Sequence, residues 1–347
     1  MASYRRFSPA PHAGPQRSWF RRCQLIGSKL IYHWRCEAID QIGNAHLKKL
    51  GNNRPGIQLG CDLPYFAHSS EIRDFVQAVE SLGYDTLSFS EHVAATRDSP
   101  FPAGFSFEDE WHEAFVQAAF VSAVTQRIEL TTSMALLALR PTVLAAKQAA
   151  EIDLLSHGRL RLGVSIGWNE REVESLGQNP RNRGARFEEQ IHVMRLLWSQ
   201  PSVTFSGRFH ELSQVGISPR PTRKIPVWVG AGRFTANGIP SDKSLRRIAR
   251  CADGYKMFAP LGLQPTAAMD VIERLRHIVA EEGRDADSVA IEARLLTQAT
   301  PRDEWRSSVE QWARRGADYV SLGNRVAGGS VDDQIRLLAD VIGVVRG

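Results

Sequence analysis

Eight short apolar or β-branched runs, each followed by a longer segment with helical periodicity, constrain the fold of this 347-residue chain more than any other feature. The runs cover residues 56–61, 85–90, 127–134, 159–166, 225–230, 253–258, 288–295 and 317–323. Apolar side chains share one helical face after the first run and after the last: Ile72, Phe75, Val76 and Val79, then Ile335, Leu338, Ile342 and Val345. Strands that alternate with helices predict right-handed crossovers and a parallel sheet.

Eight such units within residues 56–347 predict a single (β/α)8 TIM barrel domain. A doubly wound sheet is the structural alternative, but it would need a glycine-rich turn after the first strand, and "GCDLPYFAHSSE" contains no G-x-G-x-x-G. The segment 171–224 exceeds one helix and contains "SVTFSGRFHEL", which has a hairpin signal around Ser206 and Gly207. We therefore expect an insertion region between the fourth and fifth strands.

The charge of the chain is concentrated at its beginning. The net charge is +5, yet residues 1–55 hold ten Lys or Arg against two acidic residues, and the rest of the chain has 33 basic and 36 acidic residues. We expect residues 1–55 to be a flexible basic extension, and the barrel to have no nucleic-acid-binding surface.

The cysteines and the apolar runs exclude further classes. The four cysteines form no C-x-x-C, so we expect no metal site, no disulfide framework and a cytoplasmic location. The longest apolar-leaning run, "LTTSMALLAL", ends at Arg140 and is too short to cross a membrane.

Two short motifs suggest other chemistry. "GVSIG" at 163–167 fits the G-x-S-x-G elbow of serine hydrolases, with Ser165 as nucleophile. The base would have to be His192, His210 or His277; two of these lie in helical segments and one in the hairpin, so a hydrolase is a remote alternative. "WHEAF" at 111–115 has half of the H-E-x-x-H zinc motif without its second histidine, which predicts a helix start.

In a TIM barrel, chemistry takes place where the strands end. Small or polar residues follow four consecutive predicted strands: Glu91 and His92; Thr132, Ser133 and Met134; Ser165, Gly167 and Trp168; and Gly230, Ala231 and Gly232. Glycines let a ligand approach the backbone, and amides near a helix start favour phosphate. His92 is the group among them that titrates near neutral pH. These strand ends are the candidate site.

Several fragments in this order resemble the luciferase-like family of flavin and deazaflavin oxidoreductases, and more closely its branch that uses coenzyme F420. They are "GYDTLSFSEHV" (83–93), "TQRIELTTSM" (125–134), "LAAKQAAEIDLLSHGRLRLGVSIGWNEREVESLG" (144–177) and "IPVWVGAG" (225–232). The resemblance implies a barrel with an insertion and a non-proline cis peptide between Ser133 and Met134, behind the cofactor ring. Ser165 occupies a position where relatives carry a small residue.

The resemblance also implies roles for individual residues. His92 would transfer a proton at the ring edge, with Glu91 beside it as an orienting group. Gly167 and Trp168 would wall the ring and the cofactor tail, and Gly230, Ala231 and Gly232 would contact the phosphate. Arg183 and Arg186 match family positions as well, although ion pairs with Glu188 or Glu189 on a helix surface are the simpler interpretation.

The sequence thus predicts a cytoplasmic oxidoreductase that uses F420 to exchange a hydride with a small organic substrate. An FMN-dependent monooxygenase of the same family is the nearest alternative, and a non-catalytic flavin-binding barrel is a more distant one. Since members of the family are often dimers, we expect a homodimer.

Overall fold

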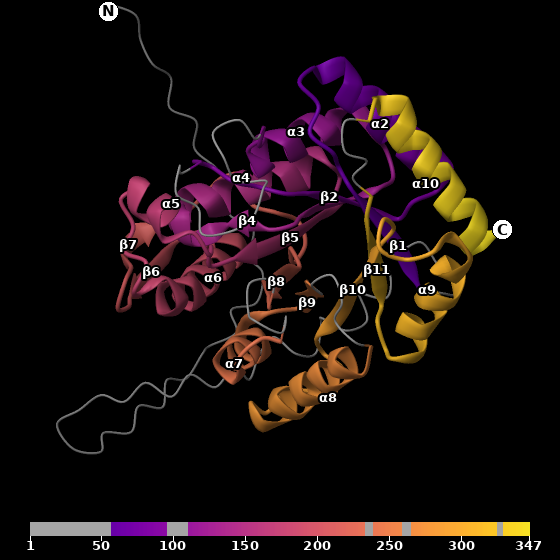
Figure 1. Ribbon diagram of the computed structural model, residues 1–347. Helices are drawn as coiled ribbons and strands as arrows, with labels where there is room; N and C mark the ends of the chain where they lie inside the picture. The colour runs from indigo at the N-terminus through magenta and orange to yellow at the C-terminus, as the bar shows by residue number, and fades with distance from the viewer. Residues whose placement is uncertain (1–56, 96–109, 233–238, 259–264, 325–328) are drawn as a thin grey trace, which may run out of the picture. The chain divides into compact units, whose positions relative to one another are not determined.

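The computed structural model describes residues 57–95, 110–232, 239–258, 265–324 and 329–347 (Figure 1). The predicted extension, residues 1–55, lies outside them. Within the described residues, eight parallel strands form a closed barrel, because β3 pairs with β5 and β11 pairs with β1. The strands are β1 (Gln58–Asp62), β2 (Thr86–Phe89), β3 (Glu129–Thr132), β5 (Leu160–Ser165), β8 (Val227–Ala231), β9 (Gly254–Met257), β10 (Ala290–Leu296) and β11 (Tyr319–Gly323). The predicted TIM barrel is confirmed.

Helices surround the strands (Figure 1). Those that follow barrel strands are α2 (Ser69–Leu82), α3 (Ala114–Val124), α4 (Thr142–Leu155), α6 (Arg183–Ser199), α7 (Asp242–Cys251), α8 (Pro265–Glu281), α9 (Trp305–Arg314, after the 3-10 turn Arg302–Glu304) and α10 (Val331–Arg346). The buried residues of α2 are Ile72, Phe75, Val76 and Val79, which is the predicted face. Helix α2 ends at Gly83, whose φ of 89° lies in the left-handed region that glycine adopts without strain. On α10, Leu338 is buried and Ile335, Ile342 and Val345 pack partly buried against the same core.

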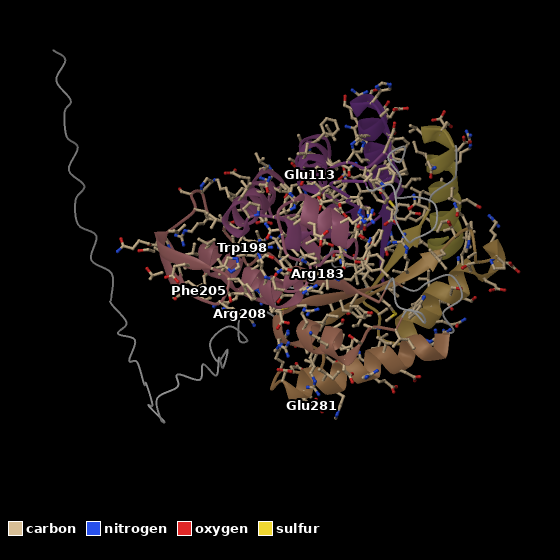
Figure 2. All side chains as sticks on the ribbon, turned by 60° about the vertical axis from the view of Figure 1, so that its left-hand side comes forward. Glu113, Arg183, Trp198, Phe205, Arg208 and Glu281 are labelled. Atoms are coloured by element: carbon tan, nitrogen blue, oxygen red, sulfur yellow. The ribbon has the colours of Figure 1, made fainter. Side chains whose placement is uncertain are left out.

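The predicted insertion between the fourth and fifth barrel strands is present. It contains α5 (Glu170–Ser175), α6 and an antiparallel hairpin of β6 (Val203–Ser206) and β7 (Glu211–Val215). Figure 2 shows Phe205 and Arg208 in this hairpin and Arg183 at the start of α6.

The expected surface ion pairs of Arg183 and Arg186 are wrong. Arg183 binds Glu170 at 3.1 Å, and Arg186 donates to the backbone carbonyls of Ala138 and Arg140. Glu188 instead binds Arg247 and Arg250, and Glu189 binds His210. The partners of these arginines and glutamates are set by the packing of α6 against α4 and α7. The spacing of residues within one helix does not reveal that packing.

The third barrel strand is interrupted where the sequence predicted a continuous run. β3 ends at Thr132, the peptide between Ser133 and Met134 is cis, and the chain then resumes as β4 (Ala135–Leu136) and a 3-10 turn (Leu137–Leu139). The amide of Ser133 donates to the carbonyl of Phe89 at 2.6 Å. Across on β5, a Cβ at Gly163 would overlap the carbonyl oxygen of Thr132, so glycine permits this close approach. The predicted cis peptide is confirmed.

Charged side chains fill part of the barrel interior. Arg161 on β5 binds Glu129 on β3 at 2.8 Å and Glu292 on β10 at 2.6 Å. Its guanidinium also lies over the rings of Trp228 and Tyr319, at 4.2 and 4.4 Å. Glu292 in turn binds Lys256 on β9 at 2.6 Å. Barrel interiors are usually filled with bulky apolar residues, whereas charges can be buried here because each has a partner.

No helix in the described part of the chain combines the length and apolar character needed to span a bilayer.

The charged interior makes stability depend on pH. Burial acts to raise the pKa of Glu292, but Lys256 and Arg161 lower it to about 2. Because the folded pKa lies below the unfolded one, the contribution of Glu292 to the free energy of unfolding is full above about pH 4.5 and is lost as pH falls towards about 2. We expect Glu292→Gln to flatten the dependence of this free energy on acidic pH, measured by urea denaturation.

Glu304→Gln, at an exposed carboxylate, is the matched control and should retain the wild-type slope. Equal slopes in the wild type and Glu292→Gln would contradict the assignment.

Candidate functional site

The four strand ends predicted to carry the site adjoin one another in the barrel. β2 pairs with β3, β3 with β5, and β5 with β8. Because all the barrel strands are parallel, their carboxyl ends open on one face. Residues from four separate segments of the sequence therefore gather at one end of the barrel.

A glutamate holds the imidazole of His92, which follows β2 on this face. Its Nδ1 lies 3.0 Å from Oε2 of Glu172, which is buried on α5. The other oxygen of Glu172 accepts hydrogen bonds from the amides of Val93 and Ala94, at 2.7 and 3.2 Å. One carboxylate thus fixes both the imidazole and the backbone that follows it.

The short helix α5 places Glu172. Asn169 caps its start, with Oδ1 accepting from the amides of Arg171 and Glu172 at 3.2 and 3.4 Å. The sequence analysis did not single out Glu172. The available signal was "WNERE", an asparagine cap with acids in the first turn directly after a strand end.

The carboxylate of Glu172 selects a tautomer of His92. Since a carboxylate accepts hydrogen bonds, Nδ1 carries the proton that it donates to Glu172. Nε2 is then the ring nitrogen that carries no proton in the neutral imidazole, and the carboxylate would stabilise an imidazolium.

Glu91 has a different set of partners. Its buried carboxylate accepts from the amides of Ala114, at 3.1 Å, and Leu136, at 2.7 Å, and pairs with Arg140. Burial raises the pKa of Glu91, while Arg140 and the two amides act to lower it. We therefore assign Glu91 to joining β2, α3 and β4, and assign the orienting role expected of it to Glu172.

Ser133 and Met134 form a compact floor at the end of β3. A Cβ at Gly230 on β8 would lie 2.8 Å from Cγ of Met134 and 2.7 Å from the ring of Phe258, so the missing side chain makes room for both. Oγ of Ser133 is buried and has no hydrogen-bond partner among the described residues. An unsatisfied buried hydroxyl is costly, and a ligand at this face would satisfy it.

Two glycines with positive φ follow the neighbouring strands. Gly167 has a φ of 72° and Gly232 a φ of 98°. A Cβ at Gly167 would find its nearest atoms at 3.8 Å, so conformation rather than crowding calls for glycine there. Beside it, the ring of Trp168 meets that of His92 at 5.6 Å, edge to face.

The remaining predicted residues make contacts within and between the strands that carry the site. Thr132 donates its hydroxyl to the carbonyl of Gly163 at 2.6 Å, and Ser165 lies opposite Leu136 in the pairing of β4 with β5. The carbonyl of Ala231 accepts from the hydroxyl of Tyr255 at 3.3 Å. Residues 233–238, which follow the expected phosphate turn, lie outside the described residues.

The hydrolase alternative gains no support. In the described chain, His210 binds Thr142 at 2.6 Å and Glu189 at 2.8 Å, and His277 binds Glu281 at 3.1 Å on an exposed face. His192, on α6, lies beside the ring of Phe205 in the hairpin. Among the same residues, no three His, Cys, Asp or Glu side chains lie together in a way that could hold a metal ion.

Comparisons with known proteins identify the family of the chain. The family model for luciferase-like monooxygenases matches residues 53–334. The chain belongs to this family. It is 30% identical over 258 residues to an uncharacterised protein of Mycobacterium tuberculosis (70% of this chain, 83% of that protein). It is 28% identical over 312 residues to the pyrimidine monooxygenase RutA of Acinetobacter baylyi (86% of this chain, 79% of that protein).

The fold resembles that of an F420-dependent secondary alcohol dehydrogenase solved with an F420–acetone adduct. The TM-score is 0.68 at 17% identity, covering 84% of this chain and all of the other. The family match identifies the chain as an oxidoreductase, which sets aside the non-catalytic alternative.

The pairing of His92 with Glu172 is testable without a substrate. We expect the 15N chemical shifts of His92 in the wild type to report a protonated Nδ1. Glu172→Gln should lose this preference, because an amide can donate as well as accept. Glu174→Gln, at an exposed position of the same helix, should leave the shifts unchanged. An identical His92 spectrum in Glu172→Gln would contradict the assignment.

Proposed function

We propose that this luciferase-like protein is an F420-dependent oxidoreductase that exchanges a hydride with a small organic substrate. The observation that carries the proposal is the hydrogen bond between His92 and Glu172 at the carboxyl ends of the strands. An imidazole held in one tautomer by a carboxylate suits the transfer of the proton that accompanies a hydride. The F420-dependent alcohol dehydrogenase of similar fold is consistent with this choice.

The residues present fit a tricyclic ring. Ser133 and Met134 would support one face of it, and the unpartnered buried hydroxyl of Ser133 would donate a hydrogen bond. Trp168 would wall the ring, with Gly167 leaving the backbone accessible. Beyond Gly230, the backbone of Ala231 and Gly232 would meet the phosphate, since amides that point at a ligand favour an anion.

The chain itself handles the proton. When bound, the deazaflavin supplies the hydride acceptor or donor. As an alcohol substrate loses hydride from carbon, its hydroxyl proton would pass to Nε2 of His92, and reduction of a carbonyl would return it. Glu172 would stabilise the imidazolium formed in between. Glu91 acts indirectly, by keeping the segments on either side of the site in place.

A second candidate is an FMN-dependent monooxygenase, in which reduced flavin reacts with oxygen. The resemblance to the pyrimidine monooxygenase RutA over 86% of this chain favours it. The same floor and wall would accept FMN, because both cofactors carry a tricyclic ring and a phosphate. The expected homodimer and cytoplasmic location stay predictions.

Titration of the purified protein with F420 and, separately, with FMN distinguishes the two candidates. We expect F420 to bind more tightly, as measured by fluorescence quenching. Gly230→Ala should weaken that binding by about tenfold, because the added methyl group displaces Met134 or Phe258. Gly343→Ala is the control, since a Cβ there meets no atom within 4 Å.

Tight FMN binding without a response to F420 would overturn the choice of cofactor and favour the monooxygenase. Failure of both cofactors to bind would contradict the assignment of the site itself.

A further inference from the structure

A second ion pair lies at the same end of the barrel, outside the site described above. It joins Asp62, the last residue of β1, to Arg294 on β10. Along these strands the alternate residues Cys61, Ala293 and Leu295 belong to the apolar core outside the sheet, so Asp62 and Arg294 point inward. The side chains of Asp62 and Arg294 are 11% and 17% exposed, whereas both side chains of the deeper Arg161–Glu292 pair are 1% exposed. The pair therefore reaches solvent at the site face.

The geometry of this pair is built by β11, which lies between the two strands. Asn324 accepts from the amide of Asp62 at 2.9 Å and donates to its carbonyl at 3.1 Å, which fixes the backbone of Asp62. A Cβ at Gly323 would lie 3.2 Å from a guanidinium nitrogen of Arg294, so glycine leaves a path for the side chain. Both terminal nitrogens of Arg294 contact the carboxylate, Nη1 at 3.4 Å and Nη2 more closely. The contact is therefore bidentate.

A row of edge-to-face aromatic contacts joins Tyr65, in the loop after β1, to His92. Tyr65 follows Asp62 by three residues, and its ring meets that of Trp111 at 4.5 Å. Trp111 meets His92 at 4.8 Å, and His92 meets Trp168 at 5.6 Å, each edge to face. These four side chains come from β1, β2 and β5 exits and from the segment before α3, and all are partly exposed. The polar pair and this aromatic row, which includes His92, thus both lie at the carboxyl ends of the barrel strands.

We propose that this polar pair and aromatic row form the substrate subsite, and that it takes a neutral, planar heteroaromatic compound with a hydrogen-bond donor and an acceptor on one edge. The carboxylate of Asp62 cancels the charge of Arg294, so the pair does not favour an anion over a neutral ligand. It presents guanidinium N–H groups beside a carboxylate oxygen, which together match a ring edge that carries C=O next to N–H. The aromatic row matches the faces of such a ring. Binding of such a compound does not depend on the proposed function; only its conversion as the substrate does.

Isothermal titration of the full chain without cofactor tests the subsite directly. The probes are 2-pyridone, a neutral ring with adjacent N–H and C=O, and benzoate, a planar anion of similar size. We expect 2-pyridone to bind more tightly than benzoate. Arg294→Met should weaken 2-pyridone binding by about tenfold or more, because the donors are lost. Arg302→Met removes an arginine of the exposed pair with Asp340 and should leave binding unchanged.

Arg294→Lys keeps the charge and loses the forked geometry, so it separates recognition from folding. We expect it to fold with wild-type circular dichroism and still to bind 2-pyridone several-fold more weakly. Equal or tighter binding of benzoate, no binding of 2-pyridone, or wild-type affinity in a folded Arg294→Lys would overturn the subsite. Binding of F420 or FMN is measured on the same proteins: cofactor binding without 2-pyridone binding refutes the subsite alone, and the converse refutes the proposed function alone.

Discussion

The register of the barrel depends first on the pairing of the charges buried in its interior. Arg161 binds carboxylates from β3 and β10, and Glu292 passes the network on to Lys256 of β9. Removing either partner of such a pair leaves a charge in a medium that solvates it poorly, which costs about 3–5 kcal/mol. Four of the eight barrel strands are therefore held at fixed heights relative to one another. This alignment of the strands sets where each strand ends, and therefore where the residues of the site lie.

Above this network, two further carboxylates organise the site from its loops. Glu91 binds Arg140 and the amides of Ala114, which begins α3, and of Leu136, which ends β4, so it fixes the segments on both sides of the cis peptide. Glu172 binds His92 and the two amides that follow it. The same residue type thus joins structural segments in one case and holds the proposed proton-transfer residue, His92, in the other. The difference lies in what each carboxylate meets: an arginine and backbone amides, or an imidazole.

Much of this arrangement could be predicted from the sequence. Apolar runs that alternate with helical periods predicted the strands, and family fragments located the cis peptide at Ser133 and Met134. Glu172 could not be found in this way, because it is 80 residues from His92 and meets it only through the turn of a six-residue helix. The ion pairs of the barrel interior could not be predicted for the same reason. Alternation shows which side chains point inward, but barrel closure decides which of them meet. Arg186 was misassigned because its partners are carbonyls of another segment.

In the proposed complex, a tricyclic ring lies on Ser133 and Met134, with its edge towards His92. A crystal structure of the protein with bound F420 would reveal this placement. We expect the ring face in van der Waals contact with Met134, at about 3.5–4 Å, and Nε2 of His92 directed to the substrate side of the ring edge. A ring bound elsewhere on the barrel, or one that leaves His92 facing away from it, would rule the placement out.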